Sequence, residues 1–136
     1  MEEKKILIVE DDPDHAELII EGLNVEDIGK KVILMKDGQE VIDYFQEPVI
    51  KCEEEIQSII GLIILDLNLP KIDGMEVLKF IKKNSKYCSI PVVVLSTCSR
   101  QETIDEAFKN GANGYFTKPP SYEDLVEKIK ILKKCW

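Results

Sequence analysis

The chain has 136 residues, of which 44% are hydrophobic and 32% are charged, which is enough for about one globular domain with its own core. It has no run of about 18 apolar residues that could span a membrane, and its start, MEEKK, lacks the apolar segment of a signal peptide. The net charge of −8 opposes unassisted binding to nucleic acid or to anionic lipid, because both require positive charge.

These properties predict a single domain over residues 1–136, located in the cytoplasm, with no room for a separate output domain. The cysteines agree with this location. The sequence has no Cys-x-x-Cys pair and only one histidine that could help to bind a soft metal. We therefore interpret Cys52, Cys88, Cys98 and Cys135 as reduced structural thiols.

Short apolar runs predict the strands, because a run without polar alternation suits a strand that is covered on both faces. In chain order the runs are residues 6–9, 32–35, 62–65, 92–95 and 115–116. The segments between them carry apolar residues at helical spacing.

Helix starts also have a sequence signature. The first helix is expected to open at Asp12, with Pro13 at its first position, where a missing N–H costs nothing. Each of the other four opens with an oxygen side chain that is followed three residues later by an acid, which is the capping-box pattern. These pairs are Asp37 with Glu40, Asp73 with Glu76, Ser99 with Glu102, and Ser121 with Asp124. Helix ends are expected at Gly22 or Asn24, at Asn84, and at Asn110 with Gly111.

Five strands that alternate with five helices predict an α/β fold, in which a parallel sheet lies between two layers of helices. One segment, residues 46–61, breaks the alternation and contains Pro48 and three consecutive glutamates, residues 53–55. We expect this segment to form an extended loop or a short extra helix on the surface. A partner-binding role for it is the less favoured alternative.

Polar residues follow the predicted strands. Glu10 and Asp11 follow the first strand, Asp66 the third, Ser96 the fourth and Lys118 the fifth. Because the carboxyl ends of parallel strands meet at one edge of a sheet, we expect these side chains to lie at a ligand crevice. Three close carboxylates repel one another unless a cation compensates, and their hard oxygens favour Mg²⁺ over zinc or copper. A lysine and a hydroxyl suit an anion, so the set indicates phosphoryl transfer to a carboxylate nucleophile.

Four motifs resemble the receiver domain of two-component response regulators over essentially the whole chain: "ILIVEDD", "LDLNLPKIDG", "VVVLST" and "YFTKP". The resemblance implies a flavodoxin-like, doubly wound α/β fold, with a five-stranded parallel sheet of order 2-1-3-4-5 and five flanking helices. It implies that Asp66 is the phosphoacceptor in an Mg²⁺-dependent reaction. Asp11 would bind Mg²⁺ directly, together with Asp66 and the backbone carbonyl of Asn68, while Glu10 would act through water.

The same resemblance implies further roles. Lys118 matches the phosphate-binding lysine, Ser96 the switch hydroxyl, and Tyr115 the aromatic switch, which from the residues alone would be interpreted as packing. The bond between Lys118 and Pro119 is expected to be cis. Asp12 lies one position too late for the acidic pair and is expected to cap the first helix.

The implied function is a phosphoacceptor switch rather than an enzyme, with at most slow self-dephosphorylation. A histidine kinase would phosphorylate Asp66, and the surface formed by the fourth helix, the fifth strand and the fifth helix would then signal by protein–protein interaction or phosphorelay. "EDDPDHAELI", "DLNLPKIDGMEVLKFIK" and the terminal Trp136 look most like single-domain regulators of phytochrome-type kinases. Trp136 either ends the apolar stripe of the last helix or anchors a homodimer. We interpret His15, on the first helix, as a solvated side chain.

Two other classes of protein share parts of this pattern. A flavodoxin-like cofactor binder needs a hydroxyl-rich or glycine-rich phosphate loop after the first strand, where this chain has three consecutive acids, residues 10–12. An aspartyl phosphohydrolase needs a second acid two residues after Asp66, where Asn68 stands. A receiver fold that serves only as an unphosphorylated scaffold is disfavoured, because the acids, the hydroxyl and the lysine are all present.

Overall fold

Strands and helices alternate along the chain, as the sequence predicts. The computed structural model describes residues 5–23, 32–46, 60–84, 87–119 and 121–135. Its strands are β1 (Lys5–Val9), β2 (Val32–Met35), β3 (Ile60–Asp66), β4 (Val92–Ser96) and β5 (Gly114–Thr117). Its helices are α1 (Pro13–Leu23), α2 (Gly38–Phe45), α4 (Gly74–Lys83), α5 (Gln101–Lys109) and α6 (Tyr122–Cys135). Within these described ranges, no helix combines the length and the apolar character needed to cross a membrane.

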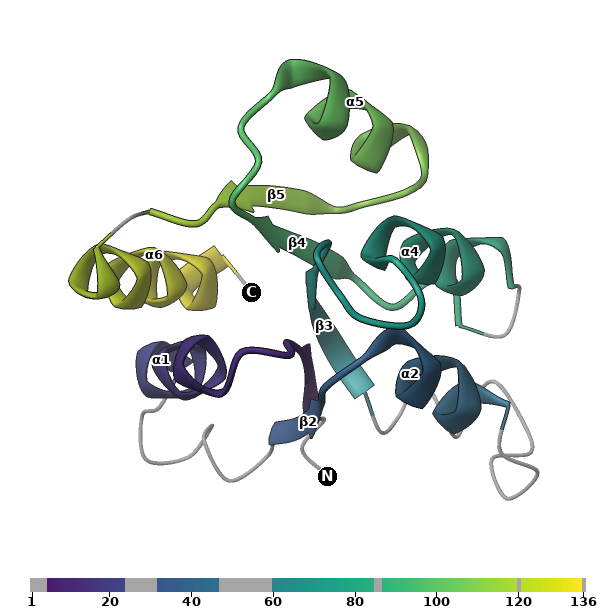
Figure 1. Ribbon diagram of the computed structural model, residues 1–136, viewed down its shortest axis with the longest axis horizontal. Coiled ribbons are helices and arrows are strands. Elements are labelled where there is room, and N and C mark those ends of the chain that lie inside the picture. The colour runs from purple at the N-terminus through teal and green to yellow at the C-terminus, as the bar shows by residue number, and fades with distance from the viewer. Residues whose placement is uncertain (1–4, 24–31, 47–59, 85–86, 120, 136) are drawn as a thin grey trace.

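The sheet is parallel throughout, with the strand order β2-β1-β3-β4-β5. This order confirms the predicted doubly wound α/β fold. Figure 1 shows α1 and α6 side by side on one face of the sheet, and α2 and α4 on the other. The winding reverses between β1 and β3, and in such sheets ligands bind at the carboxyl ends of the two strands at this point.

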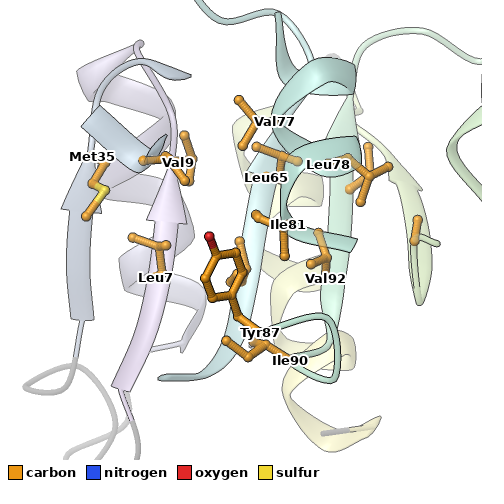
Figure 2. Packing of buried hydrophobic residues seen from close by; sticks show 14 of the residues in the cluster. Leu7, Val9, Met35, Leu65, Val77, Leu78, Ile81, Tyr87, Ile90 and Val92 are labelled. Carbon is orange, nitrogen blue, oxygen red and sulfur yellow. The ribbon is translucent and has the colours of Figure 1, made fainter. Parts of the chain in front are cut away.

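Apolar layers on both faces of the sheet explain why its strands are not alternately polar. Strand β1 contributes Leu7 and Val9 to one layer and Ile6 and Ile8 to the other. In the first layer, shown in Figure 2, side chains from β1, β3 and β4 pack against α4. The second layer lies against α1 and α6. Every residue of β3 is buried as a result, which makes this strand a rigid support for the residue at its end.

Three of the five predicted helix caps are confirmed. The Oδ1 atoms of Asp12 and Asp37 accept hydrogen bonds from the backbone N–H groups of Asp14 and Glu40, both at 2.9 Å. Ser121 Oγ accepts from the backbone N–H of Asp124 at 3.4 Å. These bonds satisfy N–H groups that have no partner within the helix.

The other two predicted caps do not form the expected side-chain hydrogen bond. Asp73 occupies the cap position of α4, as predicted, but its side chain makes no capping hydrogen bond. The loop before α4 is closed by a backbone bond, in which the N–H of Gly74 donates to the carbonyl of Leu67 at 3.0 Å. Ser99 lies before the cap position of α5, which Arg100 occupies. The capping-box pattern thus located these two helices but not their first hydrogen bonds.

Two predicted boundaries also need correction. Strand β3 begins at Ile60, inside the segment expected to be a loop or an extra helix, and residues 47–59 of that segment lie outside the described residues. Gly22 does not end α1, which continues to Leu23. A Cβ atom at Gly22 would lie 2.6 Å from Ile129 Cβ, so this glycine allows α6 to approach closely. Asn24, the alternative stop, lies outside the described residues.

The cysteines and the terminal tryptophan are only partly described. Cys88 and Cys98 are free thiols, as expected. Cys52 and Trp136 lie outside the described residues, as does the side chain of Cys135. The two interpretations of Trp136 therefore stay predictions.

Candidate functional site

The register of the sheet brings the predicted polar residues to one edge. Val9 on β1 pairs with Leu65 on β3, and Glu10 and Asp66 are the residues that come directly after this pair. The β3–β4 and β4–β5 registers place Ser96 and Lys118 further along the same edge. Residues far apart in the sequence are therefore neighbours at the carboxyl ends of the central strands.

Glu10, Asp11 and Asp66 form an acidic cluster, in which one carboxylate oxygen of each lies within 4.8 Å of the others. Glu10 and Asp66 are 2% and 4% exposed, whereas Asp11 is exposed to solvent. The backbone N–H of Asn68 donates to Asp66 Oδ1 at 3.0 Å, so the loop after β3 folds back over the carboxylate. An all-oxygen donor set that is buried on one side and open on the other fits a hard divalent cation that keeps some of its waters.

Lys118 is the positive charge within this cluster. Its Nζ atom lies 2.6 Å from Glu10 Oε1 and 3.2 Å from Asp66 Oδ2, and its side chain is only 5% exposed. Burial alone would lower the pKa of Lys118, but the contacts with Glu10 and Asp66 outweigh burial and raise it. The lysine therefore carries its charge inside the crevice.

One lysine does not compensate three carboxylates. Burial, and after it the hydrogen bond and charge of Asp66, raise the pKa of Glu10 from 4.5 to about 8, although Lys118 opposes this shift. A carboxyl whose pKa is raised in this way ionises more readily when a further cation comes close. The electrostatics of the cluster thus favour a bound cation, in agreement with its donor atoms.

Ser96 and Tyr115 meet at the backbone of Cys98. The N–H of Cys98 donates to Ser96 Oγ at 3.1 Å, and its carbonyl accepts a hydrogen bond from the Tyr115 hydroxyl at 2.6 Å. Ser96 is 1% exposed, and burial raises the pKa of the half-buried Tyr115. Ser96 and Cys98 also line a cavity of about 260 Å³ next to Asn68. Nothing in the sequence singled out Cys98 as the link between the two expected switch residues.

His15 is the other residue that sequence reasoning misplaced. Its Nδ1 atom lies 3.2 Å from Lys118 Nζ, and its side chain is 26% exposed. The interpretation of His15 as a solvated side chain is therefore wrong. The first turn of α1 starts shortly after the two acids that follow β1 and brings the imidazole to the crevice.

One backbone prediction fails at this edge. The described residues contain no cis peptide bond, so the bond between Lys118 and Pro119 is trans. The trans form is the more stable one for most X-Pro bonds, by about 0.5–1 kcal/mol. The position of Lys118 in the crevice is nevertheless as expected, and its backbone N–H donates to the Ser96 carbonyl at 2.7 Å.

Comparison with known proteins decides the family. Residues 6–130 match the family model described as the response regulator receiver domain. The chain belongs to this family. Receiver domains are the signalling switches of two-component systems, in which a histidine kinase is the partner, so the protein is a response regulator of this kind.

Two curated relatives cover most of this receiver. The protein named "Probable methanogenesis regulatory protein FilR2", from Methanothrix harundinacea, is 36% identical over 131 residues, which are 96% of this chain and 82% of FilR2. Response regulator Rcp1 from Synechocystis is 35% identical over 133 residues, which are 98% of this chain and 88% of Rcp1.

Two solved structures share the receiver fold. The phosphorylated cyanobacterial phytochrome response regulator RcpA superposes with a TM-score of 0.87 at 36% identity, over 99% of this chain and 94% of RcpA. The Mn²⁺-bound form of Rcp1 superposes with a TM-score of 0.85 at 34% identity, over 98% of this chain and 94% of the Rcp1 chain. Relatives of this receiver have thus been observed both phosphorylated and with a divalent metal.

Proposed function

We propose that this receiver accepts a phosphoryl group from a histidine kinase on Asp66. The observation that carries the proposal is the position of the Asp66 carboxylate. It lies buried at the end of the central strand β3, in contact with Lys118 and within a cluster of two further acids. A fixed nucleophile and a fixed cation are what phosphoryl transfer requires of a protein.

The acids would hold the metal ion. Asp11 and Asp66 would bind Mg²⁺ directly together with the backbone carbonyl of Asn68, and Glu10 would act through a water molecule. The Mn²⁺ in the Rcp1 structure supports a divalent ion in this type of site, and the hard oxygen donors favour Mg²⁺. When bound, Mg²⁺ would neutralise charge on the oxygens of the phosphoryl group.

Transfer forms one bond and breaks another. A carboxylate oxygen of Asp66 attacks the phosphorus of a phosphohistidine, the P–N bond breaks, and its electron pair stays on the imidazole of the kinase. Lys118 lies 3.2 Å from Asp66 Oδ2, where its ammonium group can donate to an oxygen of the arriving phosphoryl group. The product is an acyl phosphate on Asp66. We infer that the protein is a switch with at most slow self-dephosphorylation, and not an enzyme that turns over substrates.

The switch would use Ser96 and Tyr115. New phosphoryl oxygens would attract the Ser96 hydroxyl and disturb its hydrogen bond with the Cys98 N–H, while Tyr115 is bonded to the carbonyl of the same residue. A change at Ser96 is thereby passed to Tyr115 and to the surface of α5, β5 and α6, the fourth helix, fifth strand and fifth helix of the chain. A complete reversal from 1:99 to 99:1 needs a preference of about 5.5 kcal/mol for the active form.

Partners and location complete the proposal. The names of Rcp1 and RcpA support a regulator of the phytochrome-associated type, and we propose a phytochrome-type histidine kinase as the donor. The switched surface would act by binding a partner protein, by homodimerisation or by onward transfer, without direct contact to nucleic acid or membrane. We further propose a single receiver domain in the cytoplasm, where the net charge of −8 suits protein rather than nucleic-acid partners.

The test is phosphorylation with a small donor. The protein is incubated with Mg²⁺ and acetyl phosphate, and the intact mass is measured for wild type, Asp66→Asn and Asp73→Asn. Asp73 is a matched control, because it lies in the same motif but is exposed and outside the cluster. Wild type and Asp73→Asn should gain one base-labile phosphoryl group, and Asp66→Asn should gain none. Equal phosphorylation of Asp66→Asn, or none of the wild type, would overturn the proposal.

A further inference from the structure

Lys118 has more partners than its phosphate-binding role requires. Its Nζ atom contacts Glu10 Oε1 at 2.6 Å, Asp66 Oδ2 at 3.2 Å and His15 Nδ1 at 3.2 Å. An ammonium group has three N–H donors and no acceptor, so these three contacts account for all of its donors. Because the three N–H bonds keep fixed angles to one another, two occupied donors determine where the third one points.

The contact with His15 also determines the form of the imidazole. Because the lysine can only donate, His15 Nδ1 accepts, and the ring proton is on Nε2. Asp12, the cap of α1, accepts a hydrogen bond from the His15 backbone N–H at 3.4 Å. The start of α1 thus fixes the backbone from which the imidazole projects.

His15 differs from the other two partners of Lys118 in its chemistry. Glu10 and Asp66 belong to the acidic cluster, and on phosphorylation the Asp66 carboxylate becomes an acyl phosphate whose negative charge lies on the phosphoryl oxygens. His15 lies outside that cluster and is not itself phosphorylated, so it stays in contact with the lysine on the side away from Asp66. His15 can accept from Lys118 both before and after phosphorylation, whereas the partner on the other side of the ammonium group changes from the Asp66 carboxylate to the phosphoryl group.

We propose that His15 is a positioning residue for Lys118 in the phosphorylation reaction, an inference that rests on the proposed function of Asp66. Glu10 and His15 fix two N–H groups of the lysine, and the third points to Asp66, where the phosphoryl group arrives. Without the imidazole acceptor, the ammonium group is free to turn toward Glu10, which already makes the shortest of the three contacts at 2.6 Å. The third donor then no longer points at the phosphoryl oxygen.

Two substitutions test whether the hydrogen-bond acceptor of His15 or only the size of its side chain is needed. His15→Asn places a carbonyl oxygen at about the position of Nδ1, whereas His15→Leu fills a similar space without an acceptor. With acetyl phosphate and Mg²⁺, we expect His15→Leu to be phosphorylated about fivefold more slowly than wild type, the factor for one hydrogen bond of about 1 kcal/mol. His15→Asn should recover most of the rate. Equal rates for all three proteins, or equal losses in both variants, would overturn the inference.

A second measurement needs neither metal nor phosphate. The NMR signal of the Lys118 ammonium group should shift and exchange its protons faster in His15→Leu, and should stay near the wild-type position in His15→Asn. A signal that is the same in His15→Leu and in wild type would contradict the positioning role. If the NMR result is as expected but the wild type gains no phosphoryl group, the proposed function fails while the contact stands. If the wild type is phosphorylated and the Lys118 signal is unaffected, the inference about His15 alone fails.

Discussion

At the scale of single residues, the fold changes the pKa of the Glu10 carboxyl. Burial and the neighbouring Asp66 raise its pKa from 4.5 to about 8, and the contact with Lys118 only partly offsets this. In the metal-free protein, Glu10 therefore keeps its proton at pH values where an exposed glutamate is ionised. A cation that enters the cluster competes with this proton.

The raised pKa of Glu10 makes a prediction for stability. Because the folded-state pKa exceeds the unfolded value, the contribution of Glu10 is fully present below about pH 4.5 and is lost as the pH rises through about 8. In the absence of metal, the free energy of unfolding of the wild type should fall relative to that of Glu10→Gln between these pH values. Urea unfolding of both proteins at several pH values measures this difference. Parallel stability curves would show that the pKa of Glu10 is not raised.

The residues of the site were predictable to different degrees. Glu10, Asp66 and Lys118 follow apolar runs, so their position at one sheet edge could be predicted once a parallel sheet was recognised. The contact of Lys118 with His15 could not, because the two residues are 103 positions apart and His15 lies on a helix whose rotation about its axis is set by packing. Periodicity shows which residues face the core, but it does not identify which polar residue at a helix start meets a side chain from another strand.

At the scale of elements, the start of α4 packs directly against Asp66, the proposed phosphoacceptor. A Cβ atom at Gly74 would lie 2.4 Å from the carbonyl oxygen of Asp66 and 2.4 Å from Leu67 Cα. Both are backbone atoms and cannot move without shifting the strand end. The glycine in "LPKIDG" thus allows α4 to begin against the backbone of Asp66. Its position before a predicted helix did not reveal this role.

This close approach predicts the effect of adding one methyl group. Gly74→Ala should lower the free energy of unfolding by about 1–3 kcal/mol, the usual cost of overpacking. It should also slow phosphorylation, because the strand end that presents Asp66 is displaced. Gly114→Ala is the matched control, since the nearest atom to its added Cβ is Val93 Cγ2 at an ordinary 3.5 Å. Chemical denaturation measures the free energy of unfolding of both variants. Equal values for the two would refute the role assigned to Gly74.

At the scale of the whole molecule, the sequence was sufficient for the class of fold but not for every part of it. Unbroken apolar runs such as residues 62–65 predict strands that are covered on both faces, and the two buried layers confirm this. The strand order came from the family resemblance, because periodicity carries no information about which strands are neighbours. The trans bond before Pro119 and the unformed cap at Asp73 depend on local loop geometry, for which the residue pattern is a weak guide.

Metal binding should stabilise the whole fold. An ion that binds only the folded protein adds about 1.4 kcal/mol to the free energy of unfolding at a free concentration about ten times its Kd. Mg²⁺ should therefore raise the melting temperature of the wild type and of Asp14→Asn, an exposed acid outside the cluster, but not that of Asp11→Asn. Calorimetry with and without a chelator measures this. An equal effect on all three proteins would indicate nonspecific screening.

The central claim is that Asp66 is the residue that becomes phosphorylated, and locating the acyl phosphate tests it most directly. After incubation with Mg²⁺ and acetyl phosphate, the protein is reduced with borohydride, which converts an aspartyl phosphate to homoserine, and its peptides are sequenced by mass spectrometry. We predict homoserine at position 66 and unmodified acids at positions 10, 11 and 73. Homoserine at another aspartate, with position 66 unchanged, would contradict the account.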